Sequence, residues 1–270
     1  MMKQFDPALL RELTGILQAG GIADAALEAK WILEDSPSAE DARQIAKRRA
    51  KHEPLQYLLG EWEFYGLPFC VGEGVLIPRA DTETIVDAAL SRIPDRSGQQ
   101  ILDLCTGSGC IALTLAEHLP QSTVIGLEKS SEALRYAVKN QEMLHIKNAQ
   151  MLEKDVLLPE TAAAYRGLAA IVSNPPYLTA EDMQHLQEEV TYEPAAALDG
   201  GADGLHFYRE ITRLWRDALC EGGLLAYEVG VHQAKDVAAI LSQNGFGCIE
   251  CICDLGGIER VVLGRKESAS

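Results

Sequence analysis

The segment Asn174-Pro175-Pro176-Tyr177 contains residues suited to holding a planar amino group. Asn174 offers a side-chain oxygen and Pro175 a backbone carbonyl, so both hydrogens of an –NH₂ group could be accepted. The two prolines fix φ and keep the loop stiff, which preorganises these acceptors. Tyr177 could pack against the flat substrate group. We predict that all four residues bind substrate and are catalytic. An ordinary turn with a capping asparagine is the alternative.

A loop that holds both N–H hydrogens would orient the remaining electron density of the bound nitrogen in a third direction. The methyl group of a sulfonium could lie there, and desolvation would strengthen the effect of the two acceptors. No strong base is required in this arrangement, because the proton can leave after transfer. The pattern therefore indicates transfer of a methyl group to an amide or amine nitrogen.

A second segment, Asp103–Ala112 (the glycine loop), is typical of a nucleotide site. Gly107 and Gly109 permit tight turning and close approach of a ligand to the backbone. Glu128 ends the next predicted strand and could accept hydrogen bonds from ribose hydroxyls. Asp103 could hold the amino group of an amino-acid tail, whereas it would repel a pyrophosphate. The loop favours a methyltransferase, but it leaves a nicotinamide-dependent dehydrogenase or a merely structural turn open.

A parallel sheet would bring these two loops together. Apolar runs at 101–104, 124–128, 149–154, 169–173 and 224–229 alternate with helical patterns at 111–118, 131–143 and 207–220. This alternation predicts an α/β fold with a mostly parallel sheet covered on both faces. Two closing strands, at 249–253 and 260–264, predict an antiparallel pair at one edge. Asn174 follows the fourth strand, whose carboxyl end lies beside the nucleotide crevice in this sheet order.

The chain before the sheet has a different pattern. Apolar residues recur at helical spacing from about Asp6 to Lys51, which predicts a small helical bundle. Aromatic and β-branched residues between about Glu61 and Ile77 are punctuated by glycines, which predicts a β-hairpin. We therefore predict a helical domain at 1–60, a hairpin linker at 61–80 and an α/β domain at 81–266.

The charge balance bears on the partners. The chain has 24 basic and 40 acidic residues, a formal net charge of −16. A protein that binds duplex DNA by its phosphates needs several lysines or arginines on one face, so we expect no direct DNA binding. One local cluster is predicted to be a solvated helix face: Arg43, Lys47, Arg48, Arg49 and Lys51.

The cysteines and the hydropathy indicate the compartment. The start, Met1–Pro7, carries an acid and a proline where a signal peptide would be apolar, and no stretch of roughly 20 apolar residues follows. We expect a cytoplasmic protein that is not inserted in a membrane. Cys248, Cys251 and Cys253 lack the spacing of a metal site and are predicted to be small side chains in a buried strand. We expect no metal.

Several further motifs match one family in order along nearly the whole chain. The chain resembles the release factor glutamine methyltransferases, the HemK-like family. Besides the glycine loop and Asn174–Tyr177, the matching segments are Glu53–Gly60, Phe64–Gly66, Leu76–Glu83, Glu193-Pro194, Ala197-Leu198 and Asp203–Leu205.

The resemblance implies a Rossmann-like class I methyltransferase domain, with a helical N-terminal domain that helps to grip the release factor. It implies S-adenosylmethionine as cofactor and methylation of the glutamine in a Gly-Gly-Gln tripeptide. Carried over by position, Asn174–Tyr177 would bind this glutamine and Glu128 would hold the ribose. The remaining cofactor-binding residues expected are Asp103, Cys105, Thr106, Gly107, Ser108 and Gly109 at the methionine part, Asp155 and Val156 at the adenine, and Asn174.

Three residues depart from the family pattern. Cys105 stands where glycine is more frequent, Glu128 replaces a commoner aspartate, and Val156 occupies a place where an aromatic residue is frequent. We expect none of these to change the transfer chemistry. The charged residues near the predicted cleft are expected to form structural ion pairs or to lie on the surface: Arg79, Glu83, Glu188, Glu189 and Glu193.

Two other functions remain open on the residues alone. A nucleic-acid adenine or guanine amino methyltransferase could use the same diproline segment, but it would need a flipped base and a basic groove. A nicotinamide-dependent oxidoreductase would leave Asn174–Tyr177 unexplained. The charge of −16 disfavours the first alternative.

Overall fold

The computed structural model describes residues 6–268; residues 1–5 of the predicted helical domain lie outside the described range. The described part begins with α1 (Pro7–Ala19), α2 (Ala25–Asp35), α3 (Ala39–Arg49) and the short α4 (Leu55–Leu59). Asp6 caps α1 by accepting a hydrogen bond from the Ala8 amide, and Ser38 caps α3. The apolar faces of these helices form one buried cluster, which includes Leu13, Leu17, Ala29, Ile32 and Ala46.

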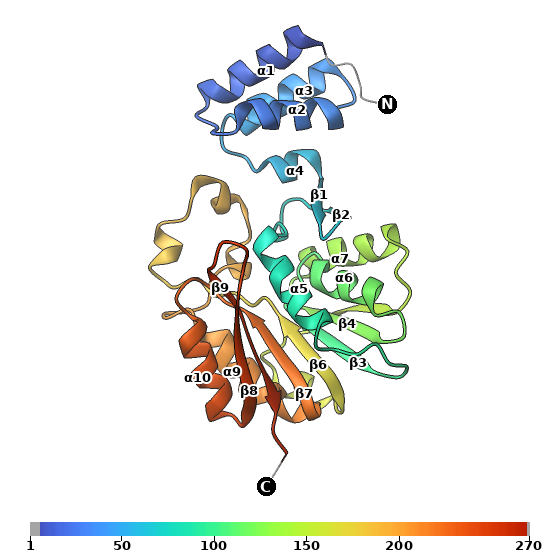
Figure 1. Cartoon of the computed structure of the whole chain (residues 1–270). Helices are drawn as coiled ribbons and strands as arrows, with labels where there is room; N and C mark the ends of the chain where they lie inside the picture. The colour runs from blue at the N-terminus through green and yellow to red at the C-terminus, as the bar shows by residue number, and fades with distance from the viewer. Residues whose placement is uncertain (1–5, 269–270) are drawn as a thin grey trace.

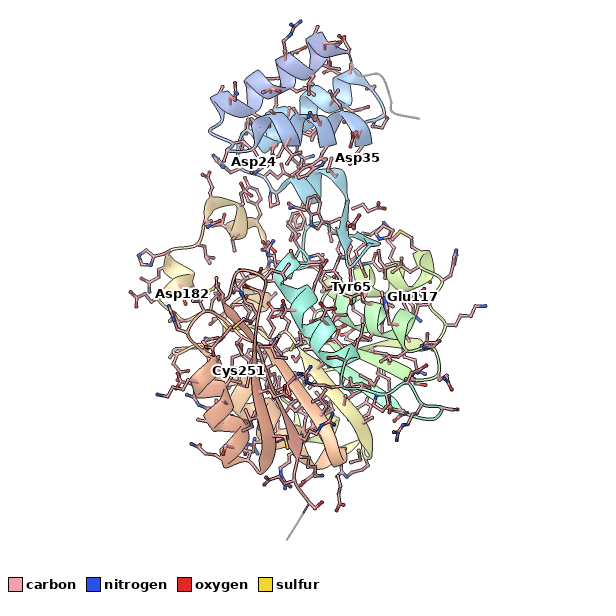
Figure 2. All side chains as sticks on the ribbon, in the orientation of Figure 1. Asp24, Asp35, Tyr65, Glu117, Asp182 and Cys251 are labelled. Atoms are coloured by element: carbon pink, nitrogen blue, oxygen red, sulfur yellow. The ribbon has the colours of Figure 1, made fainter. Side chains whose placement is uncertain are left out.

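A separate two-stranded hairpin connects these helices to the sheet (Figure 1). Strand β1 (Glu61–Phe64) pairs with β2 (Leu67–Cys70) in antiparallel register. The turn residues Tyr65 and Gly66 both have positive φ, as the right-handed twist of a two-residue hairpin requires. Trp62 contacts Trp31 edge to face on one side of the hairpin. On the other side, the Tyr65 hydroxyl donates to Asp87, and Figure 2 shows this ring near the helix that carries Glu117.

The main sheet has seven strands in the order β5-β4-β3-β6-β7-β9-β8. The first five of these are parallel, and β9 runs antiparallel to both β7 and β8. The strands are β3 (Gln100–Leu104), β4 (Thr123–Glu128), β5 (Ala149–Glu153), β6 (Leu168–Ser173), β7 (Leu219–Glu228), β8 (Phe246–Cys253) and β9 (Glu259–Lys266).

Helices cover both faces of this sheet (Figure 1). One buried cluster joins α5 (Glu83–Leu90) and α6 (Cys110–His118) to the sheet, and α7 (Ser131–Met143) packs beside α6. The second cluster joins α8 (Pro159–Ala163), α9 (His206–Trp215) and α10 (Ala234–Gln243) to the opposite face. Short 3₁₀ turns complete the connections: Ala80–Thr82, Asp182–Gln184, Glu188–Tyr192, Ala195–Ala197 and Arg216–Ala218.

The predicted α/β fold with an antiparallel edge pair is therefore confirmed. One boundary was wrong: the helix predicted at 207–220 ends at Trp215, and β7 already begins at Leu219. The prediction of buried cysteines was also wrong. Cys248, Cys251 and Cys253 are exposed, because β8 is the outermost strand and is covered only in part (Figure 2).

The basic cluster also departs from its prediction at one residue. Arg49 is 4% exposed rather than solvated, and it binds both oxygens of the buried Glu28 at 2.6 and 3.0 Å. It also donates to Glu189 at 2.7 Å, a residue of the long connection after β6. Within residues 6–268, no helix is long and apolar enough to cross a membrane.

We expect Arg49→Ala to lower the free energy of unfolding of the helical segment by about 3 kcal/mol, because it leaves the Glu28 carboxylate buried without its cation. Arg48→Ala is the matched control. Arg48 is largely exposed and pairs with Glu53, so its loss should cost less than about 1 kcal/mol. Urea unfolding followed by tryptophan fluorescence measures both. Equal effects of the two substitutions would contradict the role of the buried pair.

Candidate functional site

A cavity of about 390 Å³ opens at the carboxyl ends of the parallel strands. This volume is in the range of small-molecule sites, roughly 300–1,000 Å³. The cavity lies where β3 has β4 on one side and β6 on the other, which is the point where the order of the strands reverses. Its wall includes nine residues predicted for the site: Cys105, Thr106, Gly107, Ser108, Glu128, Asp155, Val156, Asn174 and Pro176.

The glycine loop turns sharply between β3 and α6. Cys105, Gly107 and Gly109 have φ angles of +62°, +55° and +81°. A side chain at Gly109 would meet Ala137 and Leu113 at 3.2 Å, so glycine is needed there for packing as well as for its φ. At Cys105 a residue with a Cβ adopts a left-handed conformation that glycine adopts without strain. Burial raises the pKa of the Cys105 thiol well above its ordinary value.

Asp103 lies beneath this loop and is fully buried. Its Oδ2 atom accepts hydrogen bonds from the Thr106 hydroxyl at 2.5 Å and from the Ala112 amide at 3.1 Å. Its Oδ1 atom is buried and has no partner among the described residues. Burial raises the pKa of Asp103 to about 7, although both hydrogen bonds oppose the shift. A cationic group placed above the loop would compensate this carboxylate.

Glu128 ends β4 at the far side of the loop. One carboxylate oxygen accepts from the Gly107 amide at 2.9 Å, and the other accepts from the amides of Lys129 and Ser130 at 2.9 and 2.8 Å. These three N–H groups fix the carboxylate at the cavity wall. Each carboxylate oxygen can accept more than one hydrogen bond, so capacity for two hydroxyl donors remains.

Asp155 follows β5 at the same edge. Its carboxylate pairs with Lys129 at 2.9 Å and accepts from the Leu157 amide at 2.9 Å. Partial burial alone would raise its pKa, but these two partners outweigh that effect and lower it. Val156 is buried, and its carbonyl accepts from the Trp215 indole at 2.8 Å. The segment is thus held rigidly at the wall.

Asn174 emerges from β6 into the same cavity. The preceding Ser173 donates its hydroxyl to the Leu104 carbonyl at 2.6 Å, which joins the ends of β6 and β3. The Asn174 amide nitrogen donates to the Thr82 hydroxyl oxygen at 3.4 Å. The amide oxygen is therefore directed away from Thr82 and is available as an acceptor.

Most of the rest of the diproline segment lies away from the cavity wall. Among the described residues the wall includes Pro176 but neither Pro175 nor Tyr177. Pro175 is buried, and the Tyr177 ring packs against the cluster beneath α9 and α10. The Tyr177 carbonyl accepts from the Gln233 amide at 2.9 Å, and a side chain at Gly204 would collide with this carbonyl at 2.4 Å. Direct contact of Tyr177 with substrate stays a prediction.

The sequence predicted only part of the opposite side of the site. Glu193 is buried, pairs with Arg79 and accepts from the Ile77 amide at 3.0 Å, which confirms a structural ion pair. Glu189 is paired with Arg49 and Glu83 accepts from the Tyr65 amide, again as structural partners.

Thr82 and Phe207 also line the cavity but were not predicted. Thr82 stands in the segment Leu76–Glu83, so only the resemblance marked it.

A family model and several relatives match this chain. Residues 81–202 match the model described as "Methyltransferase small domain". The chain is 42% identical to the release factor glutamine methyltransferase of Geobacter sulfurreducens, over 93% of each chain. It is 41% identical to the protein of the same name from Thermodesulfovibrio yellowstonii, over 87% of this chain and 84% of the relative. The chain belongs to the release factor glutamine methyltransferase family.

Membership of this family confirms the resemblance, and it favours methylation of a protein glutamine over the nucleic-acid methyltransferase and nicotinamide-dependent alternatives. A crystal structure of a methyltransferase from Pyrococcus furiosus shares the fold, with a TM-score of 0.55 at 17% identity, over 76% of this chain and 91% of that chain. This likeness bears out the prediction of a Rossmann-like methyltransferase sheet. Within residues 6–268, no group of three or more His, Cys, Asp or Glu side chains could hold a metal ion.

The raised pKa of Asp103 predicts how stability varies with pH. Between about pH 4 and pH 7 the folded protein keeps a proton that the unfolded chain has lost, so its stability falls as pH rises through this window. Asp103→Asn should remove this contribution. The difference in the free energy of unfolding between pH 5 and pH 8 should then be smaller than in the wild type by more than about 1 kcal/mol. Urea unfolding at the two pH values measures it. The exposed Asp217→Asn serves as control, and a profile equally steep in both variants would contradict the assignment.

Proposed function

We propose that this protein transfers a methyl group from S-adenosylmethionine to the side-chain amide nitrogen of the glutamine in the Gly-Gly-Gln tripeptide of peptide chain release factors. One observation carries the proposal. The glycine loop, Glu128 and the amide of Asn174 border the same cavity, so a nucleoside cofactor and a planar nitrogen could meet there. The names of the relatives indicate the substrate.

The residues at the cavity fit this cofactor. The buried Oδ1 atom of Asp103 has no partner among the described residues and could accept from a cationic amino group, directly or through a water. Cys105 to Gly109 would surround the methionine part, Glu128 would accept from the ribose hydroxyls, and Asp155 with Val156 would border the adenine. When bound, S-adenosylmethionine would supply a methyl group on an electrophilic sulfonium.

The chain's own contribution would be to bind and orient the acceptor nitrogen. The Asn174 oxygen and the Pro175 carbonyl would each accept one hydrogen of the glutamine –NH₂ group. The lone pair of an amide nitrogen is delocalised, so the free amide is a poor nucleophile. Two acceptors on its hydrogens would stabilise the positive charge that develops on nitrogen, and exclusion of water would strengthen both interactions. A proton then leaves the nitrogen, and the amide regains its neutral charge.

The partners and compartment follow from the same proposal. A release factor would dock with its tripeptide at the cavity mouth, and the helices α1–α4 would contribute to its recognition. All seven cysteines lie within residues 6–268 and are free, as expected for the cytoplasm, where we place the reaction. We propose no metal and no direct DNA binding. The net charge of −16 disfavours contact with DNA phosphates. No membrane association is part of the proposal.

Asn174→Ala should abolish most of the transfer while S-adenosylmethionine still binds, because it removes an acceptor of the substrate nitrogen and leaves the glycine loop intact. We expect kcat to fall about 10²–10³-fold and the cofactor affinity, measured by calorimetry, to weaken only slightly. Asn244→Ala on the distant end of α10 is the matched control. A fully active Asn174→Ala variant would refute the role of Asn174.

The reaction itself is tested with purified release factor and cofactor labelled in its methyl group. Mass spectrometry should place the label on the glutamine of the Gly-Gly-Gln tripeptide. A release factor with Gly-Gly-Ala in its place is the substrate control. Label on another residue, or transfer to nucleic acid but not to release factor, would overturn the proposed function.

A further inference from the structure

A buried asparagine on α7 joins two segments of the chain that both lead to the cavity. Asn140 is 0% exposed. Its side-chain oxygen accepts from the Cys70 amide at 2.7 Å, and its side-chain nitrogen donates to the carbonyls of Cys70 and Ser108 at 3.1 and 2.9 Å. The oxygen and both hydrogens of the amide are therefore used. The proposed transfer gives Asn140 no role.

The Ser108 carbonyl depends on this hydrogen bond. Ser108 precedes Gly109, the N-cap of α6, so its carbonyl lies outside the hydrogen-bond ladder of that helix. The Ala112 amide, in the first turn, donates to Asp103 at 3.1 Å. Ser108 is 2% exposed and lines the cavity. A buried carbonyl without a donor is costly, so Asn140 supplies the group that holds this part of the glycine loop.

The chain after β2 runs along the same face of α7 toward the cavity, and Figure 1 shows β2 next to this helix. A Cβ at Gly72 would lie 2.3 Å from the Tyr136 hydroxyl oxygen, and a Cβ at Gly74 would lie 3.0 Å from the Glu132 carboxylate. These two side chains and Asn140 are spaced four residues apart, which puts them on one face of the helix. Residues 70–79, the wall segment, therefore rest on α7. The cavity-lining residues of the wall segment are Gly74, Leu76, Ile77, Pro78 and Arg79.

We propose that Asn140 is a positioning residue for the cofactor, which fixes the glycine loop against the wall segment and so sets the spacing of the cavity that S-adenosylmethionine enters. The proposal rests on the proposed function for the identity of this ligand. Both segments line the cavity, and Asn140 is hydrogen-bonded to both. A spacing that is fixed before the ligand arrives reduces the ordering cost of binding.

Hydrogen exchange of the cofactor-free protein tests the link between the two segments. Asn140→Ala removes all three hydrogen bonds, so the backbone amides of the glycine loop and of the wall segment should open more often. We expect exchange in residues 70–79 and 105–110 to be at least about 10-fold faster than in the wild type, measured by mass spectrometry of peptides. Exchange unchanged in residues 105–110 would contradict the positioning role.

Asn148→Ala is the matched control, because Asn148 has the same kind of role at the other edge of the sheet. Its side-chain nitrogen donates to the carbonyls of Ala116, Leu119 and Ser122 at 2.9, 3.1 and 3.1 Å. These groups lie near the amino ends of β4 and β5, whereas the cavity lies at the carboxyl ends. Asn148→Ala should speed exchange near residues 116–123 and leave residues 70–79 and 105–110 within about 2-fold of the wild type.

Cofactor binding separates positioning from a merely structural effect. Asn140→Ala should weaken the affinity for S-adenosylmethionine, measured by calorimetry without release factor, about 10-fold. Asn148→Ala should leave it within about 2-fold. In turnover the KM for S-adenosylmethionine should rise about 10-fold in Asn140→Ala, while kcat at saturating cofactor stays within about 3-fold, because no hydrogen bond joins Asn140 to Asn174 or its loop.

Asn140→Ser is the milder substitution if Asn140→Ala does not fold, because it leaves room for a water near the freed carbonyls. It should weaken cofactor binding at least about 3-fold. The proposal fails if a folded Asn140 variant binds S-adenosylmethionine as tightly as the wild type, or if Asn148→Ala weakens binding equally. A wild type that binds no S-adenosylmethionine would refute the proposed function, and hydrogen exchange would still decide whether Asn140 links the two segments.

Discussion

The parallel pairing of β3 with β6 is the constraint on which the site depends. The register sets Leu104 opposite Ser173, so the glycine loop and Asn174 leave the sheet at the same level. The bond from the Ser173 hydroxyl to the Leu104 carbonyl ties the two strand ends together at that point. Because strands in a sheet lie about 4.8 Å apart, this register alone brings a nucleotide loop and an amide side chain to the same cavity. The glycine loop and Asn174 therefore need no flexible element to reach the same cavity. The rest of the fold holds this edge of the sheet in place.

Two buried carboxylates at this edge show what the arrangement costs. Asp103 lies next to the last residue of β3 and Glu228 ends β7, and burial raises the pKa of each to about 7. A core selected only for stability would replace such groups by apolar side chains. Each nevertheless keeps one carboxylate oxygen without a partner among the described residues. Asp103 also orders the glycine loop through its hydrogen bond from the Thr106 hydroxyl. The free energy spent on desolvation is compatible with a site whose polar groups must be oriented before substrate arrives.

The sequence was informative where local patterns decide the structure. Alternating strands and helices, a hairpin between about Glu61 and Ile77 and the antiparallel edge pair were all predictable from periodicity and turn residues, since these signals are local. The exposure of Cys251 was not, because an apolar-looking strand is buried or exposed according to its place in the sheet order. The burial of Arg49 depends on Glu28 and on Glu189, which is 140 residues away in the sequence. Thr82 was marked only by the resemblance, because its chemistry is not distinctive by itself, and only the folded chain places it at the cavity wall beside Asn174.

The connection after β6 makes the cavity wall and the N-terminal helices interdependent. Two carboxylates of this connection, four residues apart, bind different parts of the chain. Glu189 binds Arg49 of α3. Glu193 binds Arg79 and the Ile77 amide at the cavity wall. Tyr192, between them, donates to the Lys51 carbonyl at 3.3 Å. Figure 1 shows this connection rising from the sheet toward the helices. A shift of the helices would therefore act on Glu193 through a segment of four residues, too short and too well anchored to absorb it. The position of the helices and the shape of the wall around Asn174 are consequently set together.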